Sequence, residues 1–148
     1  MKKRFYQLIV VIIFLAVIGG SALAHCEIPC GIYDDEARIT MLFENITTIE
    51  KSMNQIIALE KEQNHNSNQL IRWVMNKEDH ANKLNEIVTQ YFMAQRIKLD
   101  AKDYDKKIGL LHQMLVYSMK CKQTTDTKNT DKLRSLVKEF KEVYFDKK

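Results

Sequence analysis

The sequence predicts an all-α protein: an antiparallel four-helix bundle that follows a leader and a short irregular segment. Three observations predict this fold. Beyond residue 34, apolar residues recur at helical spacing in four stretches, and no β-type alternation competes with them. The breaks between the stretches are short and polar. The only proline lies before the first stretch. Four amphipathic helices with short connections typically hide their apolar faces in an antiparallel bundle.

The first two helices are separated by the polar run 63–68. The first is expected to begin at Asp34 or Asp35, either of which can cap it. Its apolar face is formed by Ile39, Leu42, Phe43, Ile46, Ile49, Met53, Ile56 and Ile57. The second helix fades after Gln95 and Arg96. One of its sides carries Leu70, Trp73, Val74, Ala81, Leu84, Ile87, Val88 and Tyr91.

The third and fourth helices are separated by a polar, turn-like stretch at 123–130. The third is expected at about Tyr104–Lys122 and the fourth at about Asp131–Phe145. The inward-facing residues of the third helix should be Ile108, Leu111, Leu115 and Met119. The fourth should bury Leu133, Leu136, Val137, Phe140, Val143 and Tyr144. Residues 35–148 are thus predicted to form one bundle domain.

The first 24 residues have the pattern of a cleaved signal peptide. A basic start precedes an unbroken apolar run from Leu8 to Ile18, and Ala22 and Ala24 place a cleavage site just before His25. The run is too short to span a bilayer comfortably, although the stretch from Phe5 to Ala24 leaves an uncleaved anchor as an alternative. We therefore expect an exported protein, periplasmic or secreted, which signal peptidase matures.

Charge argues against nucleic acid as a partner. The leader holds three of the 23 Lys and Arg residues and none of the 19 Asp and Glu residues, so the mature chain is nearly neutral. Binding to nucleic acid needs a concentrated positive field, whereas lysine and glutamate are interleaved along these helices.

Residues 25–34 follow the cleavage site and are called the hook below. Cleavage leaves His25 with a free α-amine beside its imidazole, followed by thiols at Cys26 and Cys30. The amine titrates near pH 8 and can lose its proton to a metal at modest cost. Closing a chelate ring through the Cys26 amide nitrogen requires a metal that favours planar nitrogen and sulfur donors, such as nickel(II) or copper(II) rather than zinc. A Cys26–Cys30 disulfide is the alternative in an exported protein.

The hook resembles the nickel superoxide dismutase family at its defining segment. That family's pattern, His-Cys-x-x-Pro-Cys-Gly-x-Tyr at the mature N-terminus, is matched here by residues 25–33 at every fixed position. The resemblance extends loosely over the remaining helical region. It implies an enzyme that converts superoxide to dioxygen and hydrogen peroxide with one nickel ion per subunit, cycling between Ni(II) and Ni(III). It also implies a homohexamer of four-helix subunits.

The resemblance implies roles for individual residues. The planar ligands would be the His25 amine, the Cys26 amide nitrogen, and the thiolates of Cys26 and Cys30, with the His25 imidazole as axial ligand in the oxidised state. Tyr33 would line the approach of superoxide, and Tyr91, in a Tyr-Phe pair, would be a second gate tyrosine. The family also places an acidic partner for the imidazole early in its first helix. Here the matching stretch, residues 37–39, arrives one residue sooner in the sequence and the next residue is Thr40, so no partner is assigned.

Two other classes of function stay open from the residues alone. A nickel or copper carrier would use the same ligands without turnover, and a structural bundle would carry an N-terminal disulfide. Cys121 is expected to be a buried or partly buried free thiol. The remaining histidines share no metal-ligand spacing and are expected to have surface or packing roles: His65, His80 and His112. Trp73 and the methionines lie at helical spacing and are expected in the core. The glycosylation sequon at Asn45 falls inside a predicted helix and is discounted.

Overall fold

The structure is a computed structural model that describes residues 3–4, 6–7, 31–63 and 66–146. The chain divides into two units, 1–30 and 31–148, and the second holds the bundle. Its elements are α2 (Asp35–Glu60), α3 (Ser67–Glu86), the π-helix η1 (Ile87–Arg96), α4 (Tyr104–Gln123) and α5 (Lys128–Phe145). Within the described residues, no helix is long and apolar enough to traverse a bilayer.

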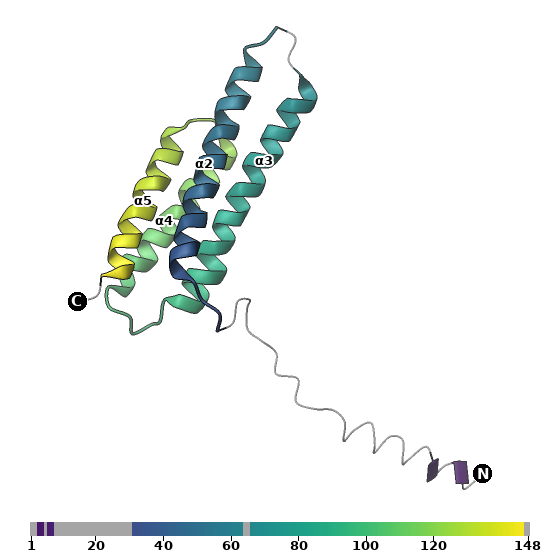
Figure 1. Cartoon of the computed structure of the whole chain (residues 1–148), viewed down its shortest axis with the longest axis vertical. Helices are drawn as coiled ribbons and strands as arrows, with labels where there is room; N and C mark the ends of the chain where they lie inside the picture. The colour runs from purple at the N-terminus through teal and green to yellow at the C-terminus, as the bar shows by residue number, and fades with distance from the viewer. Residues whose placement is uncertain (1–2, 5, 8–30, 64–65, 147–148) are drawn as a thin grey trace. The chain divides into compact units, whose positions relative to one another are not determined.

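The four long helices run alternately up and down, and this confirms the predicted antiparallel bundle (Figure 1). Helix α2 packs against α3 and α5, and α4 packs against the same two helices from the other side. One end of the bundle therefore gathers the start of α2, the end of η1 and the end of α5. This end also receives the last residues of the hook (Figure 1).

Local side-chain bonds set where the first two helices begin. The Asp34 carboxylate accepts a hydrogen bond of 3.0 Å from the Ala37 amide and caps α2. Asn66 caps α3 in the same way through the Gln69 amide at 3.2 Å. Both caps satisfy amide groups that a helix N-terminus otherwise leaves without a partner. Asp34, one of the two residues expected to cap α2, is thus its cap.

The core confirms most of the predicted inward positions. The largest fully buried side chains come from all four helices and from η1, and include Ile39, Leu42, Met53, Leu84, Phe92, Leu111, Leu133, Leu136 and Phe140. Two predicted inward residues are wrong: Val74 is 39% exposed and Met119 is 48% exposed. On α4 the inward positions are taken instead by Met114, Ser118 and Cys121, which turns Met119 outward.

Trp73 and several methionines are less buried than expected. Trp73 is half-buried, with the Lys51 ammonium 5.9 Å from its ring centre. Met41 and Met75 are exposed. Helical spacing identified the side of each helix, but the tips of α2 and α3 extend beyond α4 and α5 in Figure 1. Trp73 and Met75, in the first turns of α3, therefore have fewer neighbours to cover them, whereas Met41 lies near the opposite end of the bundle, in the second turn of α2.

Partly buried polar contacts fix the register of α2 against α3. The His80 Nδ1 atom lies 2.7 Å from the Asn45 Oδ1 atom, and the Asn76 amide donates to the Ser52 hydroxyl at 2.9 Å. Burial lowers the pKa of His80 below its ordinary value, so the ring is neutral at pH 7. His80 thus has the packing role expected from the sequence, and Asn45 is buried, which agrees with discounting the sequon.

Cys121 is a buried free thiol, as predicted. Burial raises its pKa to about 12, so almost no thiolate exists at neutral pH. Since the thiolate is the nucleophile, we expect a chain in which Cys26 and Cys30 are serine to resist iodoacetamide at pH 8 and to react once denatured. Mass spectrometry of the alkylated protein checks this. Complete native labelling within minutes would contradict the buried placement.

Candidate functional site

Only part of the hook lies among the described residues. His25, Cys26 and Cys30 lie outside them, so their predicted roles as ligands stay predictions. The described part begins at Gly31, whose φ is +80°. A side chain added at this position would meet no atom within 4 Å, so the backbone conformation is what favours glycine here. The glycine of the hook pattern therefore has a physical reason in this chain.

Tyr33 sits at the end of the hook and is 40% exposed. Its hydroxyl donates a long hydrogen bond of 3.4 Å to the Gln95 Oε1 atom. The Arg96 guanidinium lies 4.4 Å from its ring centre, and the ring stands edge-on to Tyr91 with centres 5.9 Å apart. The structure thus brings the two predicted gate residues, 58 positions apart in sequence, into contact. Their role at the gate remains a prediction.

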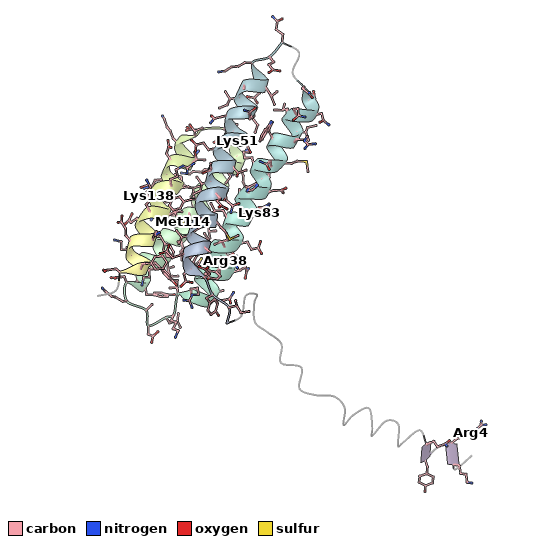
Figure 2. The ribbon with its side chains drawn as sticks, in the orientation of Figure 1. Arg4, Arg38, Lys51, Lys83, Met114 and Lys138 are labelled. Atoms are coloured by element: carbon pink, nitrogen blue, oxygen red, sulfur yellow. The ribbon has the colours of Figure 1, made fainter. Side chains whose placement is uncertain are left out.

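Tyr91 is almost completely buried, with 3% of its surface exposed. Its hydroxyl donates a hydrogen bond of 2.6 Å to the Asp35 Oδ1 atom. The Arg38 guanidinium lies 5.0 Å from its ring centre, and Phe92 packs edge-on against it at 5.1 Å. Figure 2 shows Arg38 near the start of α2. Both tyrosine rings of the pair therefore lie beside a guanidinium.

Asp35 organises this end of the bundle, and the sequence pattern did not single it out. Its carboxylate accepts four hydrogen bonds, two from Arg96 at 2.8 and 2.7 Å, one from Tyr91 and one of 2.8 Å from Tyr144. It joins the start of α2 to η1 and α5. From the sequence, an aspartate at a helix start suggests only a cap, and the cap is its neighbour Asp34. The available signal was that two successive aspartates cannot both fill the cap position.

The network shifts the pKa values of its members in opposite directions. Burial acts to raise the pKa of Asp35, but hydrogen bonds from Arg96, Tyr91 and Tyr144 outweigh it, so the pKa lies below its ordinary value. Burial and the Asp35 carboxylate raise the pKa of Tyr144 to about 12 and raise that of Tyr91 further. The hydrogen bond to Asp35 raises the pKa of Arg96. At neutral pH the carboxylate is therefore ionised and both tyrosines are protonated.

The π-helix places Tyr91 and Arg96 on the same carboxylate. A π-helix bonds each residue to one five positions away, and the Ile97 amide bonds the Phe92 carbonyl at 2.9 Å in this way. Residues five apart then lie nearly above one another, which an α-helix does not allow. The apolar pattern predicted the end of the helix near Arg96 but gave no sign of this change of register. Short π segments occur frequently at functional sites.

An Asp35→Asn variant should lose stability at neutral pH and become less sensitive to acid. The lowered pKa means that the carboxylate stabilises the native state above its unfolded pKa, near 3.9, and that this contribution disappears as pH falls through the native pKa. We expect a loss of about 2 kcal/mol at pH 7. Thermal unfolding from pH 7 to pH 3 checks this. Parallel pH profiles for the two proteins would contradict it.

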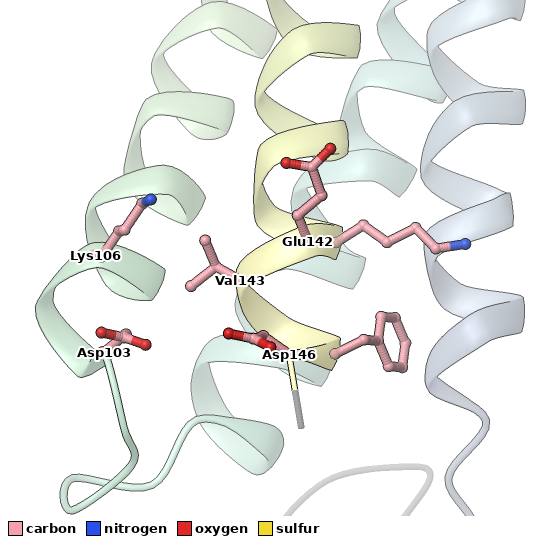
Figure 3. A pocket seen from close by; sticks show the side chains of 7 residues that line it. Asp103, Lys106, Glu142, Val143 and Asp146 are labelled. Atoms are coloured by element: carbon pink, nitrogen blue, oxygen red, sulfur yellow. The ribbon is translucent and has the colours of Figure 1, made fainter. Parts of the chain in front are cut away.

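A groove between the start of α4 and the end of α5 is a separate feature of the surface. Figure 3 shows its lining, which includes Asp103, Lys106, Glu142, Val143 and Asp146. Its charges are compensated locally, since Lys106 pairs with Glu139 at 3.5 Å and Asp146 pairs with Lys102 at 3.8 Å. None of the predicted site residues lines it. Among the residues that the structure describes, no group of three or more His, Cys, Asp or Glu side chains is arranged to hold a metal.

Comparison with known proteins identifies the family. The family model for nickel-containing superoxide dismutase matches residues 20–148, which is most of the chain and includes the whole hook. Neither the comparison with curated proteins nor that with solved structures gives a match. The matched range joins the nitrogen- and sulfur-rich hook to the helical bundle, the combination that the sequence predicted. The chain therefore belongs to the nickel-containing superoxide dismutase family, and it is a nickel-dependent superoxide dismutase.

Proposed function

We propose that the nickel is bound at the mature N-terminus by His25, Cys26 and Cys30, one ion per subunit. The donor types support this: an amine, an imidazole and two thiols within six residues suit a metal that prefers planar nitrogen and sulfur ligands. When bound, the nickel would supply the one-electron chemistry by alternating between Ni(II) and Ni(III). The described backbone supports this nickel site, because Gly31, the residue after Cys30, has the left-handed conformation that a tight turn requires.

We infer that Tyr33 lines the approach of superoxide. Tyr33 lies three positions after Cys30, and the bundle end around it is fixed by the Asp35 network. The exposed hydroxyl of Tyr33 can meet a small anion or a water molecule. Peroxide formation needs protons, and the Tyr33 hydroxyl can hold the water that delivers them.

Maturation and location are proposals as well. We propose that the chain is exported, that signal peptidase removes residues 1–24, and that nickel binds outside the cytoplasm after cleavage. The amine that the metal needs is created only by that cleavage. Nickel found already bound to a leader-bearing cytoplasmic form would contradict this order of events.

We further propose that the mature chain assembles into a homohexamer. Ile71, Val74 and Met75 lie at helical spacing on one side of α3 and are 59%, 39% and 59% exposed. An apolar side of this kind is typical of a contact surface between subunits. Sedimentation velocity of the mature protein gives its mass in solution, and a monomer at micromolar concentration would contradict the assembly.

The ligand assignment is tested by three measurements on the isolated protein: intact mass, bound nickel, and the rate of superoxide consumption. We expect a chain that begins at His25, about one nickel per subunit, and rapid consumption that is lost in His25→Ala and Cys30→Ser variants. Cys121→Ala is the matched control, because this thiol is buried in the bundle and should leave nickel binding unchanged. Stoichiometric nickel without superoxide consumption would indicate a carrier instead.

Arg38 is expected to assist the arrival of superoxide. Its guanidinium lies over the Tyr91 ring, and its only hydrogen bond among the described residues is one of 3.7 Å to the Met41 sulfur. Superoxide is an anion, so an Arg38→Ala variant should lower kcat/KM by about threefold and flatten its dependence on ionic strength. Arg134→Ala, on a distant pair with Glu50, is the control. Unchanged salt dependence in Arg38→Ala would refute this role.

A further inference from the structure

The hydroxyl groups of Tyr33 and Tyr91 differ in where they can direct a proton. A tyrosine hydroxyl carries one hydrogen and can donate one hydrogen bond. That of Tyr91 is committed to Asp35 at 2.6 Å inside the protein. That of Tyr33 makes a 3.4 Å contact with Gln95 at an exposed position. The first donor is therefore fixed, and the second can turn toward another acceptor at little cost.

Hydrogen bonds from other residues hold the Asp35 carboxylate in the orientation in which it binds Tyr91. Arg96 binds both of its oxygens in a fork, a geometry that is strong and directional. Tyr144 adds a further donor to the Oδ2 atom from α5. The side chain of Asp35 is 17% exposed, so water competes weakly for it. With donors from η1 and α5, the carboxylate cannot rotate without breaking several bonds.

Among the described residues, the Tyr91 hydroxyl donates its hydrogen to the Asp35 carboxylate. From α2 it faces Asp35 and the Arg38 guanidinium, and from η1 it faces Arg96, which binds the same carboxylate. The Tyr33 ring presents an edge to it, and the Tyr144 hydroxyl is engaged with Asp35. Both arginines are donors only. The Tyr91 hydrogen is thus directed at Asp35.

We propose that Asp35 is the positioning residue of the tyrosine pair: by taking the Tyr91 hydrogen it leaves Tyr33 as the member of the pair that donates a hydrogen bond to superoxide or to its attendant water. The two tyrosines then have different tasks. Tyr91 fixes the position of the Tyr33 ring, and Tyr33 presents the donor. The assignment of tasks rests on the proposed site at the hook, whereas the direction of the Tyr91 hydrogen bond does not.

The direction of the hydrogen bond is tested on the metal-free mature chain. NMR of protein labelled with 13C at tyrosine Cζ follows each hydroxyl during a titration, and Tyr→Phe variants assign the signals. We expect the Tyr91 hydroxyl to stay protonated above about pH 10, the ordinary pKa of tyrosine, and to titrate at least one pH unit lower in Asp35→Asn. Glu36→Gln, which removes the neighbouring 2.9 Å pair with Lys141, should leave Tyr91 unchanged. An ordinary Tyr91 titration near pH 10, or one insensitive to Asp35→Asn, would overturn the proposal.

The division of tasks is tested on the nickel-loaded enzyme. Tyr33→Phe should lower kcat about tenfold at high pH and remove most of the solvent deuterium isotope effect, because the donor is lost. Tyr91→Phe should keep the isotope effect. Asp35→Asn combined with Tyr91→Phe should be no worse than Asp35→Asn alone, since both act through one hydrogen bond. Tyr144→Phe removes the other tyrosine donor to Asp35 and should reduce stability while leaving the isotope effect intact.

The outcomes separate the two proposals. If Tyr91→Phe abolishes the isotope effect and Tyr33→Phe does not, the assigned tasks are wrong. If the nickel-loaded wild-type protein consumes no superoxide, the proposed function has failed, and the Tyr91 titration still decides the positioning role of Asp35. A wild-type isotope effect in Asp35→Glu, which keeps the carboxylate on a side chain one methylene longer, would support positioning over a purely structural role.

Discussion

A mature chain whose N-terminal amine is blocked is expected to lose all superoxide consumption above background. Acetylation of His25 removes the amine that the proposed nickel site requires, while the thiols, the imidazole and the whole bundle remain. The acetylated and free chains therefore differ by one donor atom. Stopped-flow measurement of superoxide decay, with nickel supplied in excess to both, checks this.

An additional alanine before His25 is the companion control for the blocked chain. It keeps a free amine but moves it one residue away from Cys26, so the chelate ring through the amide cannot close in the same way. We expect this chain to be as inactive as the acetylated one. Full activity in either variant would contradict an N-terminal metal site. Circular dichroism should show equal helix content in all the chains, because the bundle starts ten residues later.

Phe92→Ala is expected to cause the largest loss of stability of any single change in the bundle. Phe92 is fully buried and meets Tyr91, Phe140 and Tyr144 edge-on, with ring centres 5.1, 5.0 and 5.4 Å away. Truncating a buried phenylalanine costs about 3–5 kcal/mol, a large share of the total stability of a domain. We expect the Tm to fall by more than about 10 °C.

Phe92→Ala should also disturb the tyrosine pair, because Phe92 packs edge-on against the ring of Tyr91. Thermal unfolding followed by circular dichroism measures the stability. Near-ultraviolet circular dichroism reports the aromatic cluster. Leu99→Ala is the control, since Leu99 is 86% exposed and should change the Tm by less than about 1 °C. Equal melting of the two variants would show that the cluster does not stabilise the bundle.

The sequence predicted the helices and most of the core because the apolar residues of a buried helix face recur at a regular spacing. Leu133, Leu136, Val137 and Phe140 follow that period and are buried. Met119 follows it too and is exposed, because Met114 and Cys121 point inward on the same helix. When two neighbouring faces of a helix are both apolar, periodicity alone cannot choose between them. Contacts with α3 and α5 make that choice.

The site was predicted in part, for a different reason. The hook and Tyr33 were identified from a short pattern of residue types, which needs no knowledge of the fold. Asp35 and Arg96 could not be found in this way, because their pairing joins residues 61 positions apart. It also depends on the π register of η1, in which Tyr91 and Arg96 share one side. A pattern of apolar residues does not distinguish this register from an α-helix that continues to the same end.

The bond between Asp35 and Tyr144 makes the site depend on the completed chain. The two residues are 109 positions apart, and the second belongs to the last helix. In synthesis from the N-terminus, α2 is complete before the helix that supplies Tyr144 exists, so the Asp35 carboxylate gains its last donor only when α5 has been made. Truncated chains that end before residue 144 should therefore leave the start of α2 less firmly attached to the rest of the bundle.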